Sequence, residues 1–371
     1  MAKRVFLHIG APKSGTTYLQ TVLWANRDML RERGVLIPGQ RPFDHNRASV
    51  AVRNGHLDRR DGGVWRSFVE QSRGWHGDVV ISHEWFVAAN PERAKAALES
   101  LEGQTVHVVF TARDFVQQVP AGWQESLKLG FGWSLEEFVQ ALDTDRSRWT
   151  WRALDPAVGL PPWTVGVPHD QVHVVTVPSL TGDQALLWRR FAQACAFDPE
   201  GCDTSPAQAN ESLGAEAARW LQRIGPSLRQ AVEVGTGDWR VQYDWLRNTV
   251  AHDVLVPLGG SRIAVPEELA ATLRQRGRAT ADALVAAGYD LVGELSDLTD
   301  GHPKPGSRTP GEIADAELLP PAEALTVALL RRLKEASERA DRAERALAAR
   351  SPAHAARRAR ALLGRWRRRR G

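Results

Sequence analysis

The sequence predicts an α/β fold in which helices cover a central parallel sheet. Short apolar, β-prone runs alternate with segments of helical periodicity over the first 200 residues. This alternation is typical of parallel sheets with helices on both faces. The 371 residues are 43% hydrophobic and 25% charged, and these values exclude a wholly disordered or collagen-like chain.

Individual elements follow from local pattern. Apolar runs predict strands at residues 4–9, 79–82, 106–111 and 172–177. Apolar residues at helical spacing predict helices at 16–34, 91–101, 134–142 and 184–196. The second of these helices has a proline in its first turn, where proline is well tolerated. A mostly helical region is expected over residues 211–290.

Changes in composition divide the chain into four parts. Residues 1–300 are expected to form one domain, and residues 301–321, rich in Pro, Gly, Ser and Thr, a linker. Residues 322–349 place Leu325, Leu329 and Leu333 on one helical face. They predict an exposed or oligomerising helix. Residues 350–371 form an arginine-rich tail that is expected to be disordered.

The positive charge of the chain is concentrated in this tail. The tail holds nine arginines and no acidic residue, so the formal net charge of +4 leaves −5 on residues 1–349. The basic balance is therefore no argument that the folded domain binds nucleic acid. Leu362, Leu363 and Trp366 lie among the arginines. This pattern fits weak contact with an anionic membrane, a solvated end or an RNA-binding arm.

Other features bear on compartment and metals. No apolar run approaches the length of a membrane-spanning helix, and we expect no signal peptide. Cys195 and Cys202 are too few for a disulfide framework and lack zinc-ligand spacing. We therefore expect a cytoplasmic protein without a metal, peripheral at the inner membrane face if the tail contacts lipid.

The strongest functional signal is a glycine loop between the first strand and the first helix. Gly10 and Gly15 have the spacing of a phosphate-binding loop, and the helix that follows directs backbone N–H groups at an anion. A nucleoside-triphosphatase loop continues with Lys and Ser or Thr after the second glycine. Here Thr16 and Thr17 follow, and the only lysine is Lys13, inside the loop. No acidic residue directly ends a strand to hold Mg²⁺, so the loop favours an anion neutralised without metal.

The run Pro12-Lys13-Ser14-Gly15-Thr16-Thr17 resembles the 5′-phosphosulfate loop of sulfotransferases that use 3′-phosphoadenosine 5′-phosphosulfate (PAPS), including bacterial members. The resemblance implies a P-loop NTPase-like, three-layer α/β/α fold. It also implies PAPS as co-substrate, bound at its 5′-phosphosulfate end by Gly10, Pro12, Lys13, Ser14, Gly15, Thr16 and Thr17. Lys13 would then stabilise the leaving-group oxygen.

A second match follows the third strand. Thr111-Ala112-Arg113-Asp114 has an arginine where the family binds the 3′-phosphate of PAPS, and the planar guanidinium pairs two phosphate oxygens at once. The family usually has a serine eight residues later, but this chain has Ala121. Nearby polar side chains that could replace that serine are Gln117, Gln124 and Ser126.

A general base is expected at the end of the second strand. Ser82-His83-Glu84-Trp85 provides two candidates, and the family often ends this strand with a catalytic His or Glu. We rank Glu84 first and His83 second, whereas His8 is expected to be a core residue.

The sequence thus predicts a sulfotransferase that moves a sulfuryl group from PAPS to a hydroxyl or amine. The acceptor, whether a small molecule, a glycan or a lipid, is not identified, and no specific nucleic acid is expected. Two alternatives stay open. One is a nucleotide-dependent kinase or NTPase with a degenerate loop, and the other is a non-catalytic binding protein on the same fold.

Overall fold

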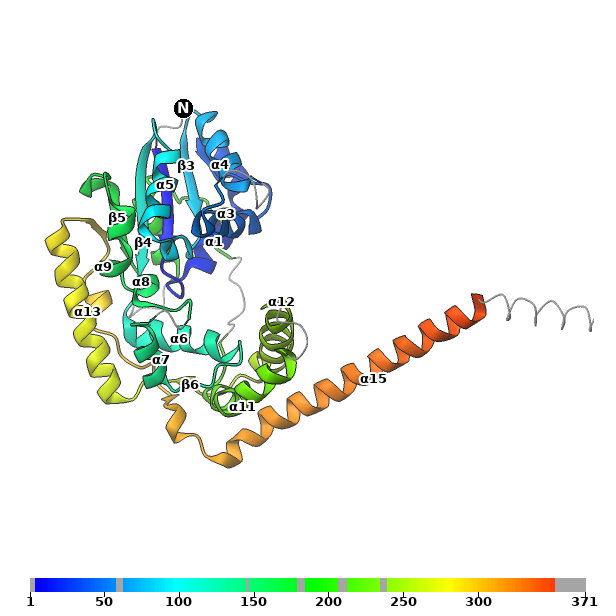
Figure 1. The fold of residues 1–371 in the computed structure, drawn as a ribbon. Helices are drawn as coiled ribbons and strands as arrows, with labels where there is room; N and C mark the ends of the chain where they lie inside the picture. The colour runs from blue at the N-terminus through cyan, green and yellow to red at the C-terminus, as the bar shows by residue number, and fades with distance from the viewer. Residues whose placement is uncertain are drawn as a thin grey trace, which may run out of the picture.

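The computed structural model describes residues 4–57, 63–144, 147–178, 184–205, 212–233 and 239–350. At its centre lies a six-stranded sheet whose neighbouring strands all run parallel (Figure 1). In spatial order the strands are β2 (Val35–Leu36), β3 (Asp78–Ser82), β1 (Arg4–Gly10), β4 (Thr105–Ala112), β5 (Val172–Thr176) and β7 (Asp290–Val292).

The predicted α/β class, the parallel sheet and all four predicted strands are confirmed. β1 lies in the middle of the sheet because its run of apolar residues can be buried on both faces. The strands β2 and β7 were not predicted. They have only two and three residues, too few for a periodic pattern.

Helices flank this sheet and extend beyond its carboxyl edge. The α-helices are α1 (Thr16–Ala25), α2 (Arg27–Glu32), α3 (Phe43–Asn54), α4 (Val64–Arg73), α5 (Pro91–Ser100), α6 (Phe115–Leu127), α7 (Leu135–Ala141), α8 (Trp151–Leu154), α9 (Pro156–Gly159), α10 (Gln184–Ala194), α11 (Ala215–Glu233), α12 (Trp239–Gln242), α13 (Glu267–Ala287), α14 (Ser296–Thr299) and α15 (Leu319–Arg350). A π-helix, η4 (Tyr243–Leu255), follows α12. The 3₁₀ turns are η1 (Phe86–Ala88), η2 (Pro161–Trp163), η3 (His169–Gln171), η5 (Val256–Leu258), η6 (Pro310–Glu312) and η7 (Asp315–Leu318).

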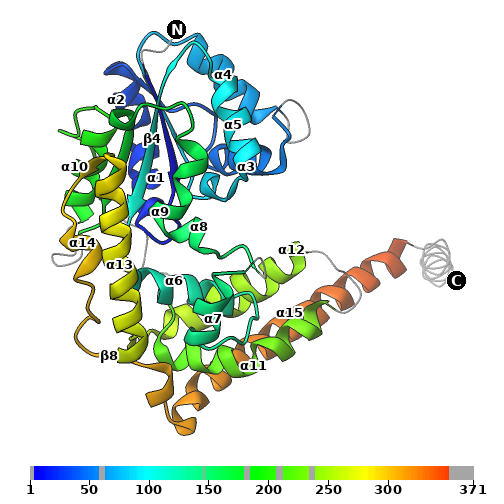
Figure 2. The same cartoon turned by 60° about the vertical axis from the view of Figure 1, so that its left-hand side comes forward.

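The alternation of side chains along β1 divides the core between the two faces of the sheet. Val5 and Leu7 pack in one buried cluster with residues of α3, α4 and α5. Phe6 packs in a second cluster with residues of α1 and α10. Helices therefore lie on both faces, an arrangement compatible with three α/β/α layers (Figure 2).

The segment expected to be a linker is structured over residues 301–318. Its strand β8 (Ser307–Arg308) pairs with β6 (Arg262–Ile263), and the turns η6 and η7 follow. Ile313 and Leu318 are buried in the main core cluster. The polar composition did not predict this structure, because the segment is held by contacts with α11 and α15 and has no periodic apolar pattern of its own.

The predicted C-terminal helix is present as α15, which begins at Leu319 against the body of the molecule. Its C-terminal part extends beyond the rest of the molecule (Figure 1). Apart from Arg350, the last residue of α15, the arginine-rich tail lies outside the described residues. Among the described residues, no helix combines the length and the apolarity that crossing a membrane requires.

Candidate active site at the carboxyl edge of the sheet

The glycine loop and Arg113 meet at the carboxyl edge of two neighbouring strands. The loop joins β1 to α1, and Arg113 follows β4, the strand beside β1. The chain places β2 and β3 on one side of β1 and β4, β5 and β7 on the other. Open parallel sheets bind ligands outside the carboxyl ends of the strands, at the point where the strand order reverses in this way. The Arg113 Nη1 atom donates to the carbonyl oxygen of Lys13 at 3.1 Å, so the structure brings the two predicted motifs together.

Four consecutive carbonyl groups of the loop are held by side chains. The Gly10 oxygen accepts from the Thr111 hydroxyl at 2.9 Å, and the Ala11 oxygen accepts from the Ser14 hydroxyl at 2.5 Å. The Pro12 oxygen accepts from the Gln118 side-chain amide at 2.9 Å, and the Lys13 oxygen accepts from the Arg113 guanidinium at 3.1 Å. Three of the four donors come from β4, α6 and the link between them. The loop backbone is therefore fixed from the neighbouring strand and helix.

The backbone amides of residues 13–17, unlike the carbonyl groups of the loop, have no hydrogen-bond partner among the described residues. Lys13 and Gly15 have positive φ angles of 66° and 83°. Glycine suits position 15 because an added Cβ would lie 2.5 Å from a Leu187 methyl group. Successive unpaired amides at a helix start form a site for an anion.

Lys13 belongs to an ion cluster around a buried carboxylate. The Glu125 Oε1 atom lies 2.9 Å from the Nζ atoms of both Lys13 and Lys128, and its Oε2 atom lies 3.2 Å from Arg247 Nε. Burial alone would raise the pKa of Glu125, but the three cations outweigh burial and hold the pKa well below its usual range. Three cations thus contact this one carboxylate beside the loop.

The two candidate bases follow β3 in a turn and contact different helices. The Glu84 Oε2 atom accepts from Gln20 Nε2 of α1 at 2.9 Å. Burial would raise the pKa of Glu84, but the nearby His83 and the Gln20 hydrogen bond lower it overall. Glu84 is thus ionised at neutral pH and lies beside the helix that follows the loop.

His83 faces the other way, towards α3. Its Nδ1 atom accepts from the Trp85 amide at 3.2 Å, and its Nε2 atom lies 3.1 Å from Asn46 Nδ2. Burial lowers the pKa of His83, so the ring is neutral at pH 7. The two candidate bases therefore lie on different sides of the turn, with Glu84 beside α1 and His83 beside α3.

His8 is fully buried, as expected, between the hydroxyl groups of Ser82 at 2.8 Å and Thr111 at 3.2 Å. Burial lowers its pKa to about 4. The ring is therefore neutral and connects the ends of β1, β3 and β4 behind the loop.

The contacts of three polar side chains differ in whether they keep the side chain beside Arg113, where it could replace the serine whose position Ala121 occupies. Arg113 Nη2 donates to Gln117 Oε1 at 2.8 Å, so Gln117 stays beside it. The other two candidates have different partners: Gln124 Oε1 accepts from the Leu213 amide at 2.8 Å, and Ser126 Oγ donates to the Trp123 carbonyl at 2.7 Å.

The segment that the sequence predicts as a linker also lies beside Arg113 and Asp114. A Cβ added to Gly301 would lie 2.1 Å from Asp114 Oδ1, so residue 301 packs directly against the start of α6. The positive charge of Arg113 contributes to a lowered pKa of Lys304, whose main cause is burial. Lys304 therefore adds a cation near Arg113 that no motif in the sequence indicates.

Two further cations lie on the Glu84 side. The guanidinium carbon of Arg148 is 4.7 Å from the centre of the Trp85 ring. Arg53 and Arg148 lie close enough to interact electrostatically with each other and with Glu84. Positive charge therefore surrounds the candidate base as well as the loop.

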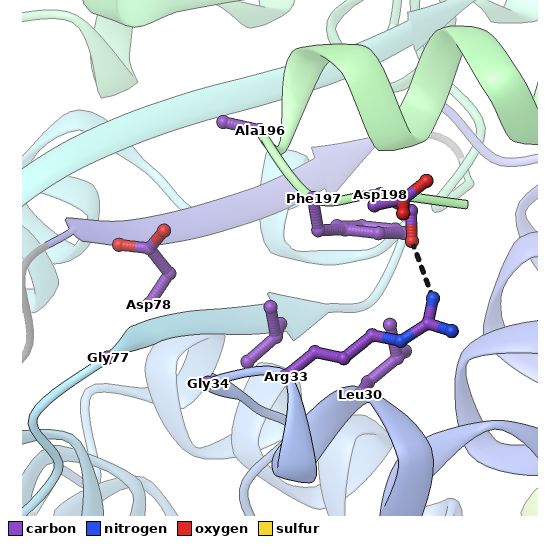
Figure 3. Close-up of a pocket in the computed structure, with 9 residues that line it drawn as sticks. Leu30, Arg33, Gly34, Gly77, Asp78, Ala196, Phe197 and Asp198 are labelled. Carbon is purple, nitrogen blue, oxygen red and sulfur yellow. Dashed lines mark hydrogen bonds between the residues drawn. The ribbon is translucent and has the colours of Figure 1, made fainter. Parts of the chain in front are cut away.

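A cavity of about 610 Å³ lies elsewhere, at the amino edge of the sheet (Figure 3). It is lined by Leu30, Arg33, Gly34, Val35, Gly77, Asp78, Ala196, Phe197 and Asp198. Asp78 is paired with Arg4 at 2.6 Å, and Arg33 donates to the backbone oxygen of Glu200 at 2.7 Å. Because Asp78 begins β3 whereas the loop follows the end of β1, this cavity is not part of the candidate site.

Within the described ranges, no group of three or more His, Cys, Asp and Glu residues is arranged to hold a metal ion. Comparison of the chain with protein-family models, with curated proteins and with solved structures gives no match.

Proposed function

We propose that this protein is a sulfotransferase with a P-loop NTPase-like fold that transfers the sulfuryl group of PAPS to a hydroxyl or amine. One observation carries the proposal. The loop carbonyls of residues 10–13 are all held by side chains, while the amides of residues 13–17 have no acceptor among the described residues. The loop thus offers donors to an anion, with Lys13 at its centre.

The charges around the loop support a ligand with two anionic ends. Lys13 and the amides of residues 13–17 would hold the 5′-phosphosulfate, together with the hydroxyl groups of Thr16 and Thr17. Arg113, with Gln117 and Lys304 nearby, would hold the 3′-phosphate. In this proposal these groups supply the positive charge that the ligand requires.

The proposed reaction is an in-line displacement at sulfur. The acceptor oxygen or nitrogen attacks sulfur, the bond from sulfur to the bridging oxygen breaks, and adenosine 3′,5′-bisphosphate leaves. Lys13 offsets the negative charge that grows on the bridging oxygen. Glu84, ionised at neutral pH, takes the acceptor proton. Positioning and charge stabilisation carry most of the rate, as in phosphoryl transfer.

Binding of adenosine 3′,5′-bisphosphate tests the proposal without knowledge of the acceptor. Calorimetry in EDTA compares the wild type with Lys13→Ala and Arg113→Ala. Lys95→Ala is the control, because this exposed lysine on α5 pairs with exposed Glu99. We expect each site substitution to weaken binding by roughly 1.5–3 kcal/mol, about 10- to 150-fold, the scale of charged hydrogen bonds. The control substitution leaves binding unchanged.

Failure of the wild type to bind this nucleotide, or equal binding by all four proteins, contradicts the proposal. Mg²⁺-dependent ATP turnover would instead favour a kinase or NTPase. Nucleotide binding without transfer of label from ³⁵S-labelled PAPS to any of a panel of phenols, sugars and amines would favour a non-catalytic binding protein.

A further inference from the structure

The projecting part of α15 has a regular apolar stripe. Its members are separated alternately by four and three residues: Leu329, Leu333, Ala336, Ala340, Ala343 and Leu347. This spacing is the heptad repeat of a coiled coil, with an average period of 3.5 residues. The side chains of Leu333 and Leu347 are 67% and 70% exposed, so this chain does not cover them itself.

A different stripe of α15 contacts the body of the protein. Pro321 and Leu325 are buried, and Arg332 donates to the Thr249 hydroxyl at 2.9 Å and to Asp253 at 2.6 Å on η4. These residues are offset by one position, about 100° of helix rotation, from the heptad stripe. The heptad stripe is thus free for a second contact.

Beyond Arg332 the described side chains of the helix are not buried against the body. Every side chain from residue 333 to residue 347 is exposed, and an isolated helix in water is only marginally stable at this length. Exposed ion pairs such as Lys334 with Glu338 contribute little. Burial of the apolar stripe against a partner would supply the missing stabilisation.

We propose that α15 pairs with the α15 of a second copy of this chain as a parallel, two-stranded coiled coil. The heptad stripe forms its seam, with Leu333, Ala340 and Leu347 at a positions and Leu329, Ala336 and Ala343 at d positions. This proposal is independent of the proposed enzymatic activity.

The flanking charges decide the orientation. Arg339 and Glu344 occupy g and e positions beside the seam, and in a parallel, in-register pair Arg339 faces the partner's Glu344. By symmetry this attraction occurs twice. An antiparallel pair that overlaps the whole stripe would instead place Arg339 beside the partner's Arg339, which is repulsive. The charge pattern therefore selects the parallel pair.

Sedimentation velocity of the intact chain over a dilution series tests the assembly. We expect a species of twice the 41.0 kDa chain mass, which the double substitution Leu333→Glu with Leu347→Glu converts to monomer. Both side chains are exposed, so the body stays folded, as its thermal unfolding will show. The matched control is Val327→Glu, an exposed apolar residue on α15 outside the seam, and it leaves the dimer intact.

Disulfide trapping tests the orientation. In a parallel pair, Leu333→Cys lies against the partner's residue 333, and oxidation links the two chains. An antiparallel pair leaves them unlinked. Cys195 is buried and Cys202 is half-buried, and the oxidised wild type measures their background.

Arg339→Glu is expected to weaken the dimer, and adding Glu344→Arg to restore it. A monomer at every concentration, or a dimer that survives the double glutamate substitution, overturns the proposal, and a dimer without crosslinks overturns its orientation.

Discussion

The Glu125 carboxylate holds together the charged groups next to the glycine loop. It contacts Lys13 from the loop, Lys128 directly after the end of α6 and Arg247 from η4. A phosphosulfate bound at the loop would share Lys13 with this carboxylate, because one ammonium group can donate to both. Glu125 thereby keeps the Lys13 side chain near the loop amides.

Replacement of Glu125 by Gln should destabilise the protein. The buried Lys128 and the partly buried Arg247 and Lys13 would lose the charge of Glu125, and we expect a loss of about 3 kcal/mol in the free energy of unfolding at pH 7. Urea denaturation of both proteins measures this difference. Glu99→Gln is the control because Glu99 is exposed.

The difference should also depend on pH with a defined sign. The pKa of Glu125 is depressed in the folded state, so its stabilisation is complete above the unfolded-state pKa of about 4.3 and decreases as pH falls below it. The wild type and Glu125→Gln should therefore converge in acid. A constant gap from pH 7 to pH 3 would contradict this explanation.

At the scale of elements, the start of α6 illustrates how burial and capping compete. Asp114 caps the helix by accepting from the Gln117 amide at 2.9 Å. Burial raises its pKa to about 6, although Arg113 and the backbone amides favour the charged form. The cap is thus held in a site that disfavours its negative charge.

This competition predicts that Asp114 makes stability depend on pH in the direction opposite to Glu125. A raised folded-state pKa makes stability decrease as pH rises from about 3.8 to 6, with a slope of up to about 1.4 kcal/mol per pH unit. Asp114→Asn retains a capping oxygen and removes the titration, so its stability should change less over this interval. Urea midpoints at closely spaced pH values measure it. Asp28→Asn, at an exposed residue in the first turn of α2, should behave as the wild type, and an unchanged slope in Asp114→Asn would exclude this role.

The elements also show what local sequence can and cannot predict. The strand β1, the glycine loop and Arg113 were predictable because a contiguous run of residues determines each of them. The pairing of Arg247 with Glu125 was not, because these residues are 122 positions apart and meet only in the folded chain. For the same reason, the position of Gly301 against Asp114 could not be inferred from a segment that resembles a linker.

At the scale of the whole molecule, charge is separated along the chain. The last 22 residues carry nine arginines and the rest of the chain has a net negative charge. A parallel α15 pair would bring two such tails to the same end of the molecule. Two tails on one particle bind a charged surface more strongly than one tail does.

Vesicle binding tests this arrangement. We expect the intact chain to sediment with phosphatidylserine vesicles at low salt and to be released at high salt, because basic residues near anionic lipid gain energy that salt screens. Truncation after residue 349 should abolish binding, and the Leu333→Glu, Leu347→Glu protein should bind more weakly than the wild type. Phosphatidylcholine vesicles are the control. If the intact chain does not sediment with anionic vesicles, the tail has no such role.

The hydrogen bonds that hold the carbonyls of residues 10–13 have one more consequence. Since Thr111, Gln118 and Arg113 fix the backbone from outside the loop, a ligand does not have to organise its own binding site. Under the proposed function, little conformational entropy would then be lost on binding, and Thr111 and Gln118 would contribute to the binding of the anion without touching it.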